Sequence, residues 1–140
     1  MKIKKVNTNR PDVLATLAFL HSACLPSDEY PDFSNGWWWI AYDEHGTPVA
    51  FAGLYPSVRW SKTGYLCRAG VVEAARGKGI QKKLIKVRIR YAKKIGYDWL
   101  VSDTRRNPAS SNALIACGFR LYEPKMPWGF RNSLYFRLKL

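Results

Sequence analysis

Cysteine and histidine are scarce in this chain, which has three cysteines and two histidines among 140 residues. The odd number and scattered positions of Cys24, Cys67 and Cys117 argue against a disulfide framework and fit a reducing compartment. These side chains also lack the spacing of metal ligands, so we expect no structural zinc site and no other bound metal.

Long apolar runs are missing as well. No segment approaches the length of a membrane span, and the basic residues 1–5 are not followed by a signal-like apolar region with a cleavage site. We therefore expect a soluble, cytoplasmic protein that does not act in a membrane. The length and the hydrophobic content of 47% suit one domain with a single core, residues 1–140.

Acidic residues are few, with 10 Asp and Glu against 23 Lys and Arg, and the formal net charge is +13. Such an excess favours anionic partners, including nucleic acid. Much of the positive charge lies between Arg76 and Arg106, so part of it could neutralise a ligand that carries several phosphates.

The stretch 68–95 organises the chain and reads as a strand, a glycine loop and a helix. The strand ends in Val71 and Val72, the loop contains Gly77 and Gly79, and the helix begins near Ile80 and stops at Gly96. Bare backbone amides before a helix can converge on one anion, helped by the helix dipole. The pattern therefore favours pyrophosphate binding, although a Gly-x-Gly turn taken alone is more often only a turn.

Two familiar phosphate-binding motifs do not fit this loop. The Walker pattern has a different spacing and needs Ser or Thr after its lysine, and the dinucleotide fingerprint needs a third glycine where Lys82 stands. Arg76 and Lys78 nevertheless add fixed positive charge beside the amides.

Alternation, turn residues and helical spacing predict the remaining elements. We expect strands at 2–6, 37–42, 48–55, 63–72, 99–103, 119–122 and 134–140, and helices at 11–24, 80–95 and 107–117, with an optional further helix in the connector 25–36. Gly53 is expected to mark a bulge. The strand–helix–strand crossover around the glycine loop implies parallel pairing there, within an otherwise antiparallel sheet.

The helix after the glycine loop has an apolar and a basic face. Its expected apolar stripe consists of Ile80, Leu84, Val87, Tyr91 and Ile95, and Ile85 and Ile89 widen it. Lysines and Arg90 occupy the opposite side, where the members of the first turn, Lys82 and Lys83, would reach phosphates. The others are either solvated or meet an acidic partner or RNA.

Acidic, histidine and tryptophan residues outside this stretch are the remaining candidates for functional roles. Asp28, Glu29 and Asp32 in the connector suit either a cationic amine substrate or an ordinary solvated loop. His21 lies on the apolar side of the first helix, which favours a core or cleft-edge role over that of a catalytic base. In the run 37–39, alternation places Trp38 on the face opposite its two neighbours.

A second motif occupies residues 107–119. Asn107 is an N-cap followed by proline at the first helical position, and Gly118 is a natural stop before Phe119. The predicted structure is a short helix between two strands.

Together the two stretches resemble the GNAT superfamily of acyl-CoA-dependent N-acyltransferases. The first, V-x-x-x-R-G-x-G-I at 72–80, is similar to the family's R/Q-x-x-G-x-G/A motif, with Ala74 at the Arg/Gln position. The second, N-x-x-S…G-F at 107–119, is similar to its asparagine motif, with Leu114 where the family often has a tyrosine. The resemblance implies an α/β (α+β) fold: one GNAT-like domain whose mixed, mostly antiparallel sheet of about seven strands has helices on both faces.

The same resemblance implies an N-acetyltransferase that uses acetyl-CoA as co-substrate and a primary amine as direct attacking group. It assigns cofactor contacts to Val71, Val72, Arg76, Gly77, Lys78, Gly79, Ile80, Gln81, Lys82, Asn107 and Ser110. Backbone amides of residues 70–72 would bind the pantetheine arm and the thioester oxygen.

The catalytic groups are less defined. Glu73, Asp103 and, third, Glu29 are candidates for the base that deprotonates the amine. Ser110 or Ser111 could replace the missing tyrosine as the proton donor to the CoA thiolate, with Tyr135 and Tyr122 as more distant alternatives. Two alternatives stay open: a nucleic-acid-binding or tRNA-modifying protein of the same fold, and a catalytically idle acyl-CoA-binding domain. The amine acceptor and the choice between monomer and homodimer are not determined by the sequence.

Overall fold

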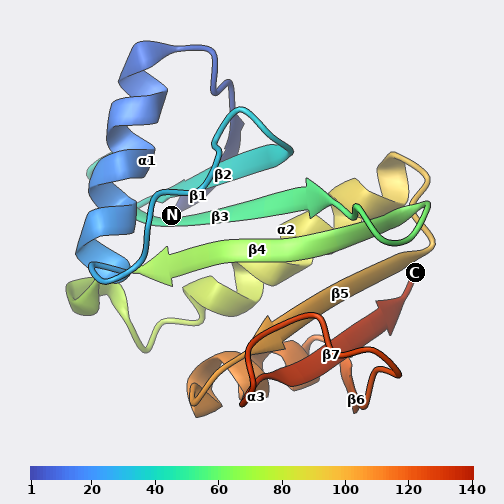
Figure 1. The fold of residues 1–140 in the computed structure, drawn as a ribbon. Coiled ribbons are helices and arrows are strands. Elements are labelled where there is room, and N and C mark those ends of the chain that lie inside the picture. The colour runs from blue at the N-terminus through green and yellow to red at the C-terminus, as the bar shows by residue number, and fades with distance from the viewer.

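The structure is a computed structural model that covers residues 1–140, with three α-helices around one seven-stranded sheet (Figure 1). The elements run in the order β1 (Lys2–Val6), α1 (Pro11–Cys24), β2 (Trp37–Tyr42), β3 (Pro48–Pro56), β4 (Thr63–Val71), a 3-10 turn (Glu73–Ala75), α2 (Ile80–Lys94), β5 (Trp99–Thr104), α3 (Pro108–Ala116), β6 (Arg120–Tyr122) and β7 (Leu134–Lys139). No helix is long and apolar enough to cross a membrane.

The strand order in the sheet is β1-β2-β3-β4-β5-β7-β6. Only β4 and β5 pair in parallel, because α2 carries the chain back to the starting end of the sheet; the other neighbours are antiparallel. The predicted fold class is therefore confirmed. The optional helix in the connector 25–36 does not form, and turns occupy that segment.

Helices cover both faces of the sheet, with α1 on one face and α2 and α3 on the other (Figure 1). Each face has its own apolar cluster, one around Leu17 and Trp38 and a larger one around Leu84 and Phe136. The predicted alternation in β2 is confirmed, since Trp38 packs beside Phe33 whereas its two neighbours pack on Tyr91 of α2.

The buried stripe of α2 differs from the predicted one. Its fully buried members are Ile80, Leu84, Ile85, Arg88 and Ala92. Val87, Tyr91 and Ile95 are only partly buried at the edge of the contact. The helix is rotated toward Arg88 because that side chain donates to the carbonyl of Gly53 in the sheet, an interaction that hydrophobic periodicity does not register.

The two parallel strands separate after a short pairing. The ladder between β4 and β5 ends at Tyr65 and Val101, although β4 continues to Val71 and β5 to Thr104. Figure 1 shows the arrowheads of β4 and β5 diverging. The pairing of β3 with β4 shifts register between Ala52 and Leu54, which confirms the predicted bulge at Gly53. The backbone of β4 beyond Tyr65 is thus left without a partner strand on the β5 side.

Candidate active site

The glycine loop contains backbone amides that have no acceptor within the protein. Gly77 and Gly79 have φ angles of 80° and 77°, a left-handed backbone that residues with a side chain rarely adopt. The amides of residues 77–79 form no backbone hydrogen bond, and those of residues 80–82 are the first of α2 and have no intrahelical acceptor. Unpaired donors at the positive end of a helix dipole are the arrangement with which proteins bind anions.

A cavity of about 510 Å³, which we call the loop cleft, lies directly against these amides. Its wall is formed by the end of β4, the glycine loop and the start of α3. The predicted contact residues in its lining are Val71, Arg76, Gly77, Gly79, Ile80, Gln81, Lys82, Asn107 and Ser110.

Val72 and Lys78 lie outside this lining. The amide of Val72 donates to the Val49 carbonyl at 2.9 Å, so it is not available to a ligand. Lys78 is exposed to solvent. The expectation that Val72 offers its amide is therefore wrong, because β4 still pairs with β3 at that point.

The start of α3 is tied to α2 across the loop cleft. Asn107 Oδ1 accepts a hydrogen bond from the Ser110 amide at 3.1 Å, which confirms the predicted N-cap. Gln81 Nε2 donates to Ser110 Oγ at 2.9 Å. Because Ser110 Oγ acts as the acceptor there, its own proton is free to be donated into the cleft.

A second cavity of about 370 Å³, the splay cavity, fills the gap between β4 and β5. It shares Leu25, Ala69, Gln81, Asn107 and Ser110 with the loop cleft, so the two cavities adjoin. Leu114, at the position of the family's tyrosine, is buried and lines this cavity.

Asp103 also lines the splay cavity, at the end of β5. Its carboxylate accepts hydrogen bonds from Tyr65 Oη at 2.9 Å and from Ser133 Oγ at 3.1 Å. Burial, together with the Asp103 charge, raises the pKa of the Tyr65 hydroxyl. The structure thus brings Asp103 and Ser110 to one cavity.

Glu73 does not join them. It begins the exposed 3-10 turn after β4 and lines neither the loop cleft nor the splay cavity. The 3-10 turn places Glu73 outside both linings, which its adjacency in sequence to Val72 does not reveal.

Arg68 ties the acidic connector to the sheet. Its Nη1 lies 3.3 Å from Asp28 Oδ2 and 3.0 Å from His21 Nε2, and it donates to the Glu29 carbonyl at 3.1 Å. Asp28 is thereby paired. His21 is fully buried, and burial followed by the Arg68 charge lowers its pKa, so it is a neutral core histidine.

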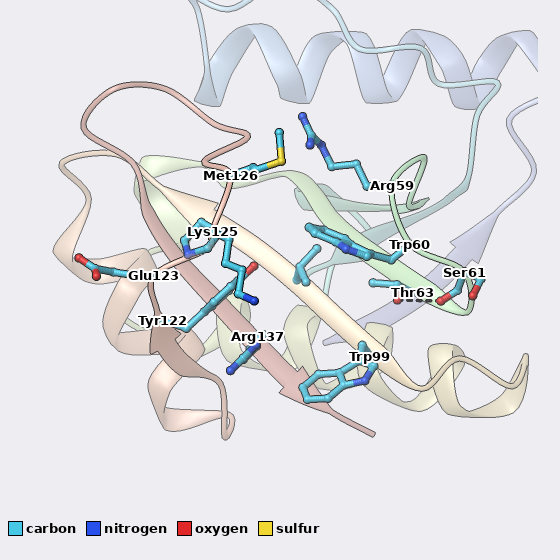
Figure 2. Close-up of a pocket in the computed structure, with 12 residues that line it drawn as sticks. Arg59, Trp60, Ser61, Thr63, Trp99, Tyr122, Glu123, Lys125, Met126 and Arg137 are labelled. Carbon is cyan, nitrogen blue, oxygen red and sulfur yellow. Dashed lines mark hydrogen bonds between the residues drawn. The ribbon is translucent and has the colours of Figure 1, made fainter.

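Figure 2 shows a third hollow, the aromatic groove, of about 1040 Å³. Its floor is formed by β5 and β7, and its sides by the loops before β4 and after β6. Cations and aromatic rings dominate its lining: Arg59, Lys125, Arg137, Trp60, Trp99 and Tyr122. The Arg137 guanidinium lies 4.4 Å from the Tyr122 ring centroid and 5.7 Å from that of Trp99.

A smaller hollow lies between the aromatic groove and the splay cavity. It has a volume of about 400 Å³ and shares Arg59, Trp60 and Val101 with the groove, and Tyr65, Asp103 and Phe130 with the splay cavity. Sequence reasoning missed the groove, since segments far apart in the chain build it. It also missed Tyr65 and Arg88, although the position of Arg88 among the apolar residues of α2 could have been noticed in the sequence.

Residues 11–119 match the family model described as the acetyltransferase (GNAT) family. The chain therefore belongs to the GNAT family, and the predicted resemblance is confirmed. No group of three or more His, Cys, Asp or Glu side chains is arranged to hold a metal ion.

Solved structures with the same fold contain CoA. An acetyltransferase from Bacillus subtilis in complex with CoA is 20% identical, with 99% of this chain and 98% of that chain covered and a TM-score of 0.77. A GNAT acetyltransferase from Elizabethkingia anophelis with acetyl-CoA bound is 20% identical, with coverages of 99% and 97% and a TM-score of 0.73.

A chain of the NatC complex bound to Gag peptide and CoA is 21% identical, with coverages of 100% and 99% and a TM-score of 0.78. At this identity the likeness establishes the shared fold. A comparison with curated protein sequences finds no significant match.

Proposed function

We propose that this protein is an N-acetyltransferase that moves an acetyl group from acetyl-CoA to a primary amine by direct attack. The observation that carries the proposal is the row of unpaired amides at residues 77–82, which lies beside a cleft that adjoins the gap between β4 and β5. The CoA-bound neighbours support the same donor.

In this proposal the diphosphate binds at the glycine loop and the pantetheine arm follows β4 into the splay cavity. Unpaired amides of β4 beyond Tyr65 stabilise the oxyanion that develops on the thioester carbonyl. A new C–N bond forms as the C–S bond breaks, and CoA leaves as a thiolate. The enzyme's main contribution is orientation of the amine against the thioester.

Two protons must move. We assign removal of the amine proton to Asp103, because it is the predicted acid that lines the splay cavity, and delivery of a proton to the thiolate to Ser110, whose hydroxyl proton is not used within the protein. Glu73 is the weaker candidate because it lies outside both cavities.

Calorimetry with acetyl-CoA, followed by measurement of CoA release with a panel of amines, tests the proposal. We expect binding below millimolar concentration and amine-dependent CoA release that drops at least about tenfold in Asp103→Asn. Absence of cofactor binding would overturn the proposal. Binding without CoA release for any amine would favour the idle acyl-CoA-binding domain.

A second candidate, an acceptor amine carried on RNA, is supported by the aromatic groove. Single-stranded nucleic acid is bound by cationic grooves with aromatic rings on which bases stack, and this groove has both. It opens toward the splay cavity, where the amine would react. The polypeptide in the NatC structure is a different kind of acceptor, and direct binding measurements separate the two.

A further inference from the structure

Arg88 is a charged side chain in the middle of the buried face of α2. It is only 2% exposed. Its Nε donates to the Leu84 carbonyl at 3.1 Å, and its Nη1 donates to the Gly53 carbonyl at 3.0 Å. These two bonds leave the Nη2 donors of the guanidinium without a protein partner.

No negative charge accompanies this guanidinium. None of the ion pairs of the protein includes Arg88. The thiols that influence it are Cys67 and Cys117, and burial raises the pKa of both, so they are neutral at physiological pH. Burial lowers the pKa of Arg88 to about 10, which leaves it charged at pH 7. An unpaired buried cation costs free energy, and an anion beside it would remove that cost.

The location of Arg88 identifies which anion could reach it. Arg88 lines the splay cavity together with Leu66, Ile85 and Leu114, whose apolar side chains suit methylene groups. The Ser102 hydroxyl, which lines the same cavity, donates to the Leu66 carbonyl at 3.2 Å. Gly53, which accepts from Arg88, contacts Cys67, so the guanidinium lies at the bulged part of β4 just past the point of separation.

We propose that Arg88 binds a carboxylate at the far end of the acyl group, so that the preferred donor is the CoA thioester of a short dicarboxylic acid. The inference rests on the proposed function, since it requires the thioester to lie in the splay cavity. Acetyl-CoA then remains a smaller donor for the same site, without the contact to Arg88. The carboxylate would accept hydrogen bonds from the unused donors of the guanidinium and form an ion pair with it.

Binding of matched thioesters tests this without knowledge of the acceptor. Calorimetry compares succinyl-CoA and malonyl-CoA with butyryl-CoA, which has the chain length of succinyl-CoA but a methyl group at its end. We expect the wild-type protein to bind at least one of the two acidic thioesters at least about tenfold more tightly than butyryl-CoA. In Arg88→Gln, which retains a donor toward Gly53, the preference should fall below about threefold while butyryl-CoA binding is kept.

Arg90→Gln is the matched control, because Arg90 is exposed on the same helix and its loss changes the net charge equally. It should retain the full preference for the acidic thioester. Equal binding of all three thioesters by the wild type would overturn the inference alone, whether or not the Arg88 variant folds. Failure to bind any thioester would overturn the proposed function and this inference with it.

Discussion

Gly79 is the single residue on which the geometry of the amide cradle most depends. Its φ of 77° precedes the first turn of α2, and an added Cβ would meet no atom within 4 Å. The cost of Gly79→Ala is therefore backbone strain alone, about 1–2 kcal/mol. We expect a loss of unfolding free energy of that size in urea, and acetyl-CoA binding weakened about tenfold as the amides turn away.

Gly96→Ala controls for strain without touching the cleft. Gly96 has a φ of 85°, an equally open surrounding, and a position after the other end of α2. This variant should lose similar stability and bind acetyl-CoA normally. Equal weakening of binding in both variants would contradict the role given to the Gly79 amide.

His21 predicts a pH dependence of stability. Its pKa is lowered in the folded protein by burial and then by the Arg68 charge, whereas the pKa of a histidine in the unfolded chain is about 6.5. Below that pH the unfolded chain binds more protons than the folded one, so the unfolding free energy falls as pH decreases, by at most about 1.4 kcal/mol per pH unit.

Urea unfolding at pH 7, 6 and 5 measures this slope. His21→Gln should flatten the dependence over this range, even if the variant is less stable at every pH. A slope unchanged by the substitution would show that other groups cause the acid sensitivity.

At the scale of elements, α3 matters because its start forms one wall of the loop cleft. Asn107→Ala removes the N-cap acceptor for the Ser110 amide and should cost about 1 kcal/mol of unfolding free energy. Loss of the cap would also disturb the hydrogen bond between Ser110 and Gln81 in the wall of the loop cleft, so acetyl-CoA binding should weaken as well. Asn107→Asp keeps an acceptor oxygen and should retain most of the stability in the same denaturation experiment.

Helix α2 shows where reading elements from sequence succeeds and where it fails. Its start at Ile80 and its end before Gly96 were predictable, because the capping glycines act locally. Its rotation was not, because the bond from Arg88 to the Gly53 carbonyl joins residues far apart in the chain. The predicted stripe therefore included Tyr91, which is partly exposed, and omitted Ala92, which is buried.

At the scale of the whole molecule, positive charge lies on both faces, and the two sets are separable. Lys125 and Arg59 border the aromatic groove, whereas Lys93 and Lys94 are exposed at the end of α2 on the opposite side of the sheet. If the groove binds RNA, Arg59→Glu with Lys125→Glu should weaken binding of a single-stranded oligonucleotide and reduce the salt slope by about 0.7 for each lost phosphate contact.

The double variant Lys93→Glu with Lys94→Glu changes the net charge equally and should bind RNA nearly as the wild type does. Fluorescence anisotropy at several salt concentrations measures both variants. Equal loss in the two would indicate unspecific attraction to a basic protein. No binding by the wild type at low salt would remove the RNA-linked acceptor from consideration.

Features that depend only on neighbouring residues could be predicted from the amino-acid sequence. The glycine loop, the N-cap at Asn107, the alternation around Trp38 and the bulge at Gly53 all follow from local conformational preferences. These features were enough to indicate the fold and the donor side of the site.

The spaces between the elements, and the groups buried there, became known only from the folded chain. Four features arise where distant segments meet: the separation of β4 from β5, the burial of Arg88 without an acidic partner, the position of Glu73 outside both cavities, and the aromatic groove. The physical reason is that desolvation and pairing of a charged group depend on every element packed around it, whereas a helix cap or a turn depends only on its own few residues.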